Sequence, residues 1–242
     1  MQLEGKNAIV TGGGRNIGRA ISIALANKGV NVAINFHKND KKAQETVEKL
    51  EEIGVKSLKI QADVRNFDQV KNMTNRVKKS LGGIDILVNN AGISGQNSTI
   101  EKINIEEWKN VIEVNLNGVF NCCKAVEAEL RKNKGKVVNI SSIAGKMGGS
   151  IGCHYAASKA GVIGLTFRLA TELAPQVTVN AIAPGPVDTE LLSPEIKKKL
   201  SGLTPFGRIA KPEEIAHTVV YLLENDYVSG EVIDVNAARY MD

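Results

Sequence analysis

The sequence predicts a single α/β domain, built on a doubly wound parallel sheet of about seven strands with helices on both faces. Short runs rich in Val and Ile alternate with amphipathic helical segments, and the runs are apolar on both faces. Strands of that kind are typical of parallel sheets buried between two helical layers. A chain of 242 residues with 43% hydrophobic content is long enough to bury such a core as one domain, 1–242.

Seven apolar runs are the predicted strands, and each is bounded by polar or turn-forming residues. They are Asn7–Thr11, Asn31–Phe36, Ser57–Gln61, Ile84–Asn89, Lys136–Ser141, Val177–Ile182 and Val232–Val235. The segments between them carry apolar residues at helical spacing, as in Ile17, Ala20 and Leu25. Because right-handed crossovers place a helix over each connection between parallel strands, the alternation predicts a helical layer on each face.

Composition and charge favour a soluble protein that acts on small molecules. The net charge is +5 and the pI 9.0, but the lysines are spread over several helical segments without interleaved aromatic residues, so we expect no nucleic-acid partner. The sequence has neither a membrane-length apolar run nor a signal peptide, so we expect no membrane partner and a cytoplasmic location. Cys122, Cys123 and Cys153 lack metal-ligand spacing, which favours reduced thiols and no metal.

A glycine-rich turn joins the first predicted strand to the first helix and predicts a diphosphate-binding site. The residues expected to surround the diphosphate are Gly12, Gly14, Arg15, Asn16, Ile17 and Gly18. Glycines allow the backbone to approach a diphosphate closely, and the free N–H groups of the helix N-terminus attract the anion. Glycine clusters are common in loops, so the prediction depends on the position of this cluster between the first strand and the first helix.

The end of the second predicted strand indicates a preference for NADP over NAD. A carboxylate there would bind the ribose 2′-hydroxyl of NAD and repel a 2′-phosphate, but no acidic residue precedes Asp40. Arg15, with His37 or Lys38, can instead meet a 2′-phosphate through charge-assisted hydrogen bonds. The alternative is that these basic side chains are merely solvated.

Tyr155 and Lys159 are the central candidate catalytic pair. They lie four residues apart, hence on one face of a helix, and an ammonium near a tyrosine favours its ionised form. Such a pair suits general acid–base chemistry. The fifth predicted strand ends in Ser141 and Ser142, at the edge where parallel sheets bind ligands. A serine there can donate to a substrate oxygen as negative charge develops, whereas a purely capping role fits Ser141 better than Ser142.

Taken in order, these motifs resemble the short-chain dehydrogenase/reductase family, with its single-domain Rossmann-like fold, and within it the bacterial 3-oxoacyl-[acyl-carrier-protein] reductases. The resemblance extends from Lys6 to about Asp234. The matching motifs are Thr11–Gly18, Asp63-Val64, Asn89-Asn90-Ala91-Gly92, Val114-Asn115-Leu116-Asn117, Ser142 thirteen residues before Tyr155, Tyr155-x-x-x-Lys159 and Pro184-Gly185.

The resemblance implies a reduction of a carbonyl with NADP(H), or less favourably with NAD(H). In it Tyr155 donates the proton, Ser142 hydrogen-bonds the substrate oxygen, and Lys159 lowers the pKa of Tyr155 and binds the nicotinamide ribose. Asn115 holds a water that links Lys159 to solvent. The remaining cofactor contacts implied are Asp63 and Val64 at the adenine, Asn90, Ala91 and Gly92, Pro184 and Gly185 beside the nicotinamide, and Val187 and Thr189 at the carboxamide.

The implied substrate is a 3-oxoacyl thioester on acyl carrier protein or coenzyme A, as in fatty acid biosynthesis. Three departures bear on this: Asn16 replaces a glycine of the family turn, the carrier-docking loop is shortened to Ala174-Pro175-Gln176, and the family's Asp-Gly-Gly is replaced after Asp234. Asparagine tolerates the left-handed conformation, so we expect the turn to survive. Basic residues that could still dock an acidic carrier are Arg131, Lys132 and Lys134.

Several alternatives remain open at this stage. The segment 189–208 is expected to form either a mobile substrate lid or a surface helix over the sheet edge. In similar proteins, helices near Glu106–Arg131 and His154–Ala174 form subunit contacts, which implies a homotetramer, with a dimer also possible. A sugar or other secondary-alcohol dehydrogenase is the alternative activity. A non-catalytic dinucleotide-binding regulator is disfavoured because all four catalytic positions are filled.

Overall fold

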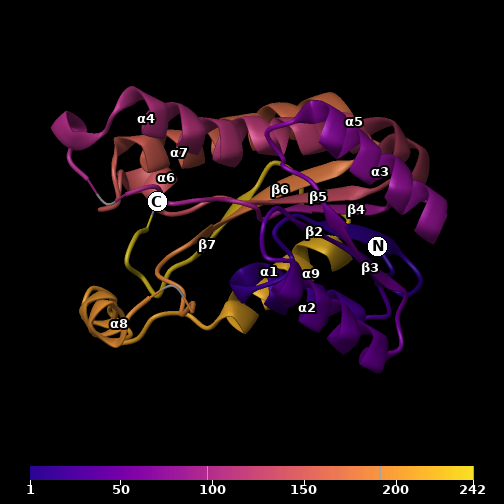
Figure 1. Cartoon of the computed structure of the whole chain (residues 1–242), viewed down its shortest axis with the longest axis horizontal. Coiled ribbons are helices and arrows are strands. Elements are labelled where there is room, and N and C mark those ends of the chain that lie inside the picture. Colours follow the sequence, from indigo (N-terminus) through magenta and orange to yellow (C-terminus); the bar gives the residue numbers. More distant parts are fainter. Residues whose placement is uncertain (97, 191, 242) are drawn as a thin grey trace.

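The computed structural model describes residues 1–96, 98–190 and 192–241, and it contains a seven-stranded, fully parallel sheet of order β3-β2-β1-β4-β5-β6-β7 (Figure 1). The strands are β1 Asn7–Val10, β2 Asn31–Phe36, β3 Ser57–Gln61, β4 Ile86–Asn89, β5 Lys136–Ile140, β6 Thr178–Pro184 and β7 Val232–Val235. All seven predicted strands are confirmed. Their ends differ by up to two residues, most visibly where β6 continues to Pro184 and so carries the sheet into the next loop.

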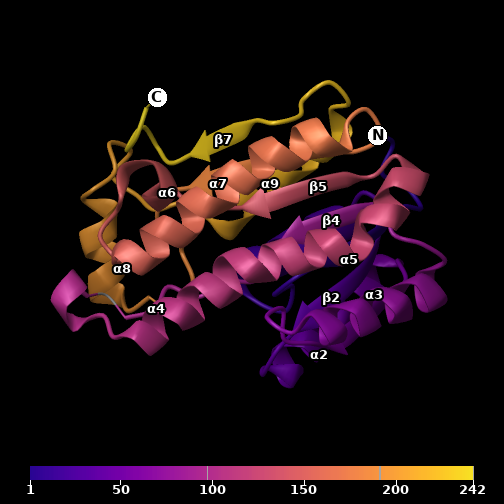
Figure 2. The ribbon, with the colours of Figure 1, turned by 90° about the horizontal axis from the view of Figure 1, so that it is seen from above.

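Helices cover both faces of the sheet, as the alternation predicts. They are α1 Asn16–Ala26, α2 Asp40–Ile53, α3 Phe67–Leu81, α4 Ile105–Ile112, α5 Gly118–Asn133, α6 Ala144–Met147, α7 Cys153–Leu173, α8 Pro194–Ser201 and α9 Pro212–Glu224. One layer contains α1, α2 and α9, and the other contains α3, α4, α5 and α7 (Figures 1 and 2). Two buried apolar clusters fill the space between the sheet and these two layers.

The chain reverses its direction of travel across the sheet at β1. This strand pairs with β2 on one side and with β4 on the other, in register Ala8↔Val32 and Ala8↔Ile86. Loops that leave β1 and β4 therefore diverge to opposite sides and open a crevice at the carboxyl ends of the strands. Parallel sheets bind ligands at such a switch point.

The long helix predicted near Glu106–Arg131 is not one regular α-helix. A π-helical turn, Glu113–Asn117, separates α4 from α5 and contains the buried Asn115. Single π turns within helices are frequently found at functional sites. Here the side chain of Asn115 hydrogen-bonds the backbone of Ile93, on another segment. The spacing of apolar residues along the helix does not reveal these bonds.

The carboxyl-terminal segment takes an unusual backbone conformation. Ala237 and Ala238 both have positive φ, 56° and 59°, in the region that favours glycine. Asn236 stabilises this turn, since its side chain donates to the carbonyl oxygen of Tyr240 at 3.1 Å. Lys146, on α6, lies 2.7 Å from Asp234 and over the ring of Tyr240. The atypical residues after Asp234 therefore pack against the loop that follows β5.

Within the described residues, no helix combines the length and the apolarity needed to cross a bilayer. Cys122 and Cys123 are buried and Cys153 is exposed, and all three are free thiols.

Candidate active site

The glycine turn after β1 is held open for a ligand by the end of β4. Asn90 donates through Nδ2 to the carbonyl oxygens of Thr11 and Gly12, at 2.9 and 3.2 Å. The hydroxyl of Thr11 accepts the N–H groups of Asn90 and Ala91 at 3.0 Å. A Cβ on Gly18 would lie 2.2 Å from the carbonyl oxygen of Gly12, so α1 can begin this close to the turn only with glycine.

Asn16 occupies the position where the family has a glycine. Its φ of 48° lies in the left-handed region, as expected from the tolerance of asparagine for that conformation. The side chain also makes a contact that glycine could not, because Oδ1 accepts the N–H of Glu190 at 3.2 Å. The replacement therefore preserves the turn, and it ties the segment after β6 to the start of α1.

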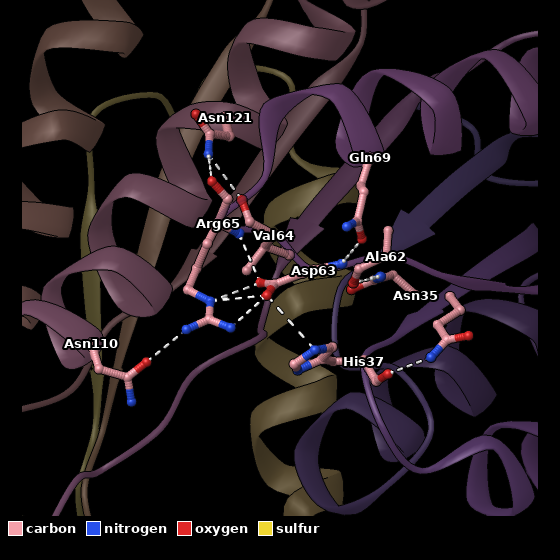
Figure 3. A network of polar contacts seen from close by, with 10 residues as sticks. Asn35, His37, Ala62, Asp63, Val64, Arg65, Gln69, Asn110 and Asn121 are labelled. Carbon is pink, nitrogen blue, oxygen red and sulfur yellow. Dashed lines mark hydrogen bonds and ion pairs between the residues drawn. The ribbon is translucent and has the colours of Figure 1, made fainter. Parts of the chain in front are cut away.

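A polar network borders the expected adenine site at the carboxyl end of β3 (Figure 3). Arg65 donates to Asp63 from Nε at 3.0 Å and from Nη2 at 2.6 Å, and Nη1 donates to Asn110 on α4 at 2.9 Å. These bonds with the Arg65 guanidinium hold the pKa of Asp63 below its usual value. His37 Nε2 lies 3.7 Å from the same carboxylate. Arg65 thus neutralises most of the negative charge that Asp63 brings to the site.

The basic residues expected at a 2′-phosphate remain accessible. Arg15 and Lys38 are exposed, and the His37 side chain is 49% exposed. Asp40, the first carboxylate after β2, accepts both of its hydrogen bonds from Lys59 at 2.7 Å. The acidic charge nearest the end of β2 is therefore compensated by a lysine from β3.

Ser142, Tyr155 and Lys159 meet beyond the carboxyl end of β5. Ser142 hydrogen-bonds Tyr155, which tends to lower the pKa of that tyrosine, but burial has the larger effect and raises it. Lys159 lies with Nζ 5.8 Å from the Tyr155 ring centroid. Tyr155 is therefore a protonated phenol at neutral pH.

The ammonium of Lys159 is engaged by the backbone in this structure. Its Nζ donates to the carbonyl oxygen of Ile140 at 2.8 Å, and burial lowers its own pKa to about 8. Burial and Ser142 shift the pKa of Tyr155 here, and Nζ of Lys159 is engaged by the carbonyl oxygen of Ile140. That Lys159 lowers the pKa of Tyr155 during the reaction stays a prediction.

The two adjacent serines make different contacts in the site. Ser141 is buried and donates to the carbonyl oxygen of Lys159 at 2.9 Å. Ser142 accepts the N–H of Ala144 at 3.1 Å in the turn that leads into α6, and it also hydrogen-bonds Tyr155. Ser141 thus fixes the backbone beside Lys159, and Ser142 is the serine that contacts Tyr155.

Asn115 is fully buried within the π turn, and its amide is used by the chain itself. Oδ1 accepts the N–H of Ile93, and Nδ2 donates to the carbonyl oxygen of Ile93, both at 2.8 Å. Nδ2 also donates to Ser158 at 3.0 Å. A Cβ on Gly92 would lie 3.2 Å from Asn115 Oδ1 and 3.6 Å from Lys159 Nζ. Asn115 thus fixes the loop after β4 beside Lys159, and a bound water there stays a prediction.

The segment after β6 runs along the nicotinamide side of the expected site. Pro184 accepts the N–H of Ile143 at 3.1 Å, and Gly185 donates to the carbonyl oxygen of Val235 at 2.9 Å. Val187 forms a parallel bridge with Ala210. The carbonyl oxygen of Thr189 accepts the N–H of Leu192 at 3.2 Å. These contacts bring the predicted carboxamide residues to the same edge of the sheet as Ser142.

The predicted lid, 189–208, contains the helix α8. This helix has no buried residue and lies beyond the carboxyl ends of the strands, away from the faces of the sheet (Figure 1). Lys197 pairs with Asp188 at 2.6 Å, and Lys42 of α2 lies 3.4 Å from Glu190. Leu191 lies outside the described residues. The segment is therefore attached at its base to β6, α1 and α2, while a closing motion remains a prediction.

These residues fit a nicotinamide dinucleotide. At Gly12 and Gly18 an added Cβ would crowd neighbouring atoms of the turn. Because both positions lack a side chain, the backbone of the turn stays accessible to a diphosphate. The predicted adenine and nicotinamide contacts lie on opposite sides of this turn, at β3 and β6. The protein therefore presents one continuous edge with donors for the diphosphate and a phenol, a hydroxyl and an ammonium near its nicotinamide end.

The buried ammonium of Lys159 gives the protein a measurable pH dependence of stability. The folded chain loses this proton near pH 8, whereas the unfolded chain keeps it to about 10.5, so the cost of burying the charge is present below pH 8 and is relieved toward pH 10.5. We expect the free energy of unfolding of Lys159→Met to exceed that of wild type most at or below pH 8. The difference should shrink by at most about 1.4 kcal/mol per pH unit above that. Denaturant titrations of both proteins at several pH values measure it, and parallel pH curves would contradict it.

Comparison with known proteins agrees with this site. The family model described as short chain dehydrogenase matches residues 6–200. The 3-oxoacyl-[acyl-carrier-protein] reductase FabG of Staphylococcus aureus (strain Mu50) is 43% identical over 243 aligned positions that cover 98% of each chain. The 3-oxoacyl-[acyl-carrier-protein] reductase of Synechocystis is 37% identical over 97% of this chain and 96% of its own.

Solved structures give the same result. A 3-oxoacyl-[acyl-carrier protein] reductase from Brucella melitensis has a TM-score of 0.92 at 34% identity, covering all of this chain and 93% of the other. A second Brucella melitensis structure, with bound NAD, has a TM-score of 0.90 at 34% identity and covers 95% of that chain. The chain belongs to the short-chain dehydrogenase family. It is an oxidoreductase that acts on CH–OH or C=O groups with a nicotinamide dinucleotide, and it resembles the 3-oxoacyl-[acyl-carrier-protein] reductases.

Sequence reasoning did not identify three residues that the site uses. Arg65 pairs with Asp63, and Glu107 lies 3.7 Å from His154, the residue before Tyr155. The Asp-x-Arg spacing of Asp63 and Arg65 was a possible signal for the first. No sequence pattern signals Glu107 and His154, because they become neighbours only when α4 and α7 pack together.

Proposed function

We propose that the protein is an NADPH-dependent reductase that converts the ketone of a 3-oxoacyl thioester to a secondary alcohol. The observation that carries the proposal is the convergence of Ser142, Tyr155 and Lys159 at the sheet edge that also presents the glycine turn. The resemblance to 3-oxoacyl reductases supports the substrate class. Tyr155, Ser142, Lys159 and Asn115 are the proposed catalytic residues.

In the proposed reaction, the phenol of Tyr155 gives its proton to the carbonyl oxygen. The raised pKa of Tyr155 suits an acid that must keep its proton until the substrate is in place. Ser142 donates a hydrogen bond to the same oxygen as negative charge develops on it. A bound nicotinamide supplies the hydride that the carbonyl carbon receives. Lys159 stabilises the tyrosinate that is left, and solvent then restores the proton to Tyr155.

The preference for NADPH rests on the charges at the end of β2. Arg15, His37 and Lys38 are accessible, while Asp63 and Asp40 are each compensated by a basic partner. We expect kcat/KM with NADPH to exceed that with NADH by about 10- to 100-fold, the worth of one or two charge-assisted hydrogen bonds. Steady-state assays with both cofactors measure this ratio. Arg15→Gln should lower it while leaving the NADH value nearly unchanged, and equal values in the wild-type protein would refute the preference.

The acyl group is proposed to arrive on acyl carrier protein or coenzyme A. Arg131 lies beside the shortened loop, where it donates to Gln176 at 3.3 Å and to the carbonyl oxygen of Glu172 at 3.0 Å. Its guanidinium also pairs with Glu127, and the exposed Lys132 and Lys134 follow it in the chain. A panel of acetoacetyl-coenzyme A, acyl carrier protein thioesters, sugars and aliphatic ketones, assayed through NADPH absorbance, tests the substrate class. Turnover of sugars alone would favour the alternative, a sugar or other secondary-alcohol dehydrogenase.

A homotetramer is the proposed assembly. Phe120 on α5 and Phe167 on α7 are 47% and 49% exposed on the outer helical layer (Figure 2). Rings exposed to that extent on neighbouring helices suit burial against another subunit. Light scattering during size-exclusion chromatography should give four times the 26.0 kDa of one chain. A monomer mass at micromolar concentration would contradict the proposal.

A further inference from the structure

His154, the residue directly before Tyr155, is fully buried, and its ring lies between two glycines. A Cβ on Gly95 would lie 2.6 Å from His154 Nε2, and one on Gly152 would lie 2.7 Å from Cε1. Real Cβ contacts are essentially never that short, so any other residue at either position would displace the ring. Two segments far apart in the sequence thus leave space for one imidazole beside the proposed proton donor.

The two nitrogens of this imidazole face different partners. Nδ1 accepts the backbone N–H of Tyr155 at 2.8 Å. A nitrogen that accepts a hydrogen bond carries no proton, so the proton of the neutral ring is on Nε2. Nε2 has no hydrogen-bond partner among the described residues, although Oε1 of Glu107 lies 3.7 Å away. A buried donor therefore lies near a carboxylate, just beyond hydrogen-bond distance.

Glu107 connects His154 to the loop that follows β4. It lies on α4, its side chain is only 15% exposed, and its Oε1 accepts the N–H of Gln96. The same loop begins at Gly92 beside Lys159 and is held at Ile93 by Asn115. The start of α7 and α4 lie at the same end of the helical layer, where this loop runs (Figure 2).

We propose that His154 is a positioning residue for the reaction. Its Nδ1 fixes the main chain of Tyr155, and its Nε2 proton bonds Glu107 when the far end of the loop, Gly95–Gln96, closes on a bound substrate. Closure by about 0.8 Å brings Nε2 and Oε1 to ordinary hydrogen-bond distance. An unpaired buried donor is unfavourable, so forming this bond favours the closed loop. The inference rests on the proposed role of Tyr155 as proton donor.

Two substitutions separate the functions of the two nitrogens. Asparagine in His154→Asn places an amide oxygen where Nδ1 accepts from Tyr155 but does not reach Glu107. Glutamine in His154→Gln brings an amide nitrogen toward Glu107 and offers no acceptor near Nδ1. With acetoacetyl-coenzyme A and NADPH, we expect His154→Asn to raise the KM for the thioester about 10-fold and to change kcat less than 3-fold. His154→Gln should lower kcat at least 10-fold and leave KM nearly unchanged.

Removal of the carboxylate provides the matched control. In a Glu107→Ala background, His154→Asn should raise KM no further, whereas His154→Gln should still lower kcat in full. Nitrogen-15 spectra of histidine-labelled protein should show His154, assigned by its loss in His154→Asn, as a neutral ring protonated at Nε2. The binding of NADPH, followed by fluorescence, should be unchanged in both variants.

Several outcomes would overturn the inference. These are equal changes of KM and kcat in the two variants, no change in either, full additivity with Glu107→Ala, or a proton on Nδ1. The proposed function fails in a different way: the wild-type protein would reduce no carbonyl compound with either cofactor. That result would refute the proposed function and, with it, the role of His154 in catalysis. A fully active enzyme whose His154 variants have wild-type kinetics would refute the inference about His154 alone.

Discussion

Tyr155→Phe is expected to reduce turnover by at least about 100-fold, the lower end of what a positioned general acid contributes. The substitution removes only the phenol oxygen, so the ring and its packing beside Lys159 are kept. NADPH affinity should change little, because the cofactor contacts proposed for the glycine turn and for Lys159 are intact. Steady-state kinetics and a fluorescence titration of NADPH measure the two effects separately.

Ser142→Ala is the appropriate companion to this variant. It removes the hydroxyl that bonds Tyr155 and also the cap on the N–H of Ala144, so it should lower kcat and slightly lower stability. Turnover of Tyr155→Phe within a factor of three of wild type would refute the assigned proton donor. A large loss of NADPH binding in that variant would instead indicate that the tyrosine holds the cofactor.

Gly18→Ala is expected to weaken NADPH binding about 10- to 100-fold, roughly 1.4–2.8 kcal/mol. The new Cβ would lie 2.2 Å from the carbonyl oxygen of Gly12 and 2.6 Å from Nδ2 of Asn90. The first atom belongs to the backbone, and the second ends a side chain that is held by hydrogen bonds to Thr11 and Gly12. The turn must therefore open, and the Asn90 bonds that shape it must lengthen. The same variant should unfold at a lower denaturant concentration than the wild-type protein.

Gly164→Ala is the control for a methyl group added to a helical glycine. It lies in α7, and no heavy atom stands within 4 Å of the added Cβ. This variant should bind NADPH as the wild type does. Equal NADPH affinity in Gly18→Ala and Gly164→Ala would show that the turn tolerates a side chain and would contradict the assigned role of Gly18.

The fold was predictable from local sequence because its strands and helices each carry a clear pattern. Val- and Ile-rich runs apolar on both faces predicted the strands of the parallel sheet, whereas the strand order, with β1 between β2 and β4, was not predicted. Asn16 was correctly expected to adopt the left-handed conformation, since its side chain alone determines that tolerance. The π turn at Asn115 was not predictable, because bonds to Ile93 on another segment accompany it.

The structure brings the predicted Ser142, Tyr155 and Lys159 together, while their catalytic roles and that of Asn115 stay predictions. The electrostatics of these residues could not be predicted from the sequence. The hydrogen bond of Lys159 depends on the carbonyl group of Ile140, and the raised pKa of Tyr155 depends on burial. The four-residue spacing of the two side chains reveals neither. The space for the His154 ring could not be predicted from the sequence either, since two glycines from different loops form it.

The central position of β1 divides the site between early and late parts of the nascent chain. Strands β1, β2 and β3 can pair as soon as residue 61 is made, and they carry the glycine turn and one wall of the adenosine site. The proton donor arrives only with α7, and β7 must reach the far edge before Val235 can accept the N–H of Gly185. Pairing between distant segments forms late because of its loop-closure entropy. The expected contacts to the diphosphate and the adenosine thus precede residue 136 in the chain, whereas the proposed acid and the expected nicotinamide contacts from Pro184 to Thr189 follow it.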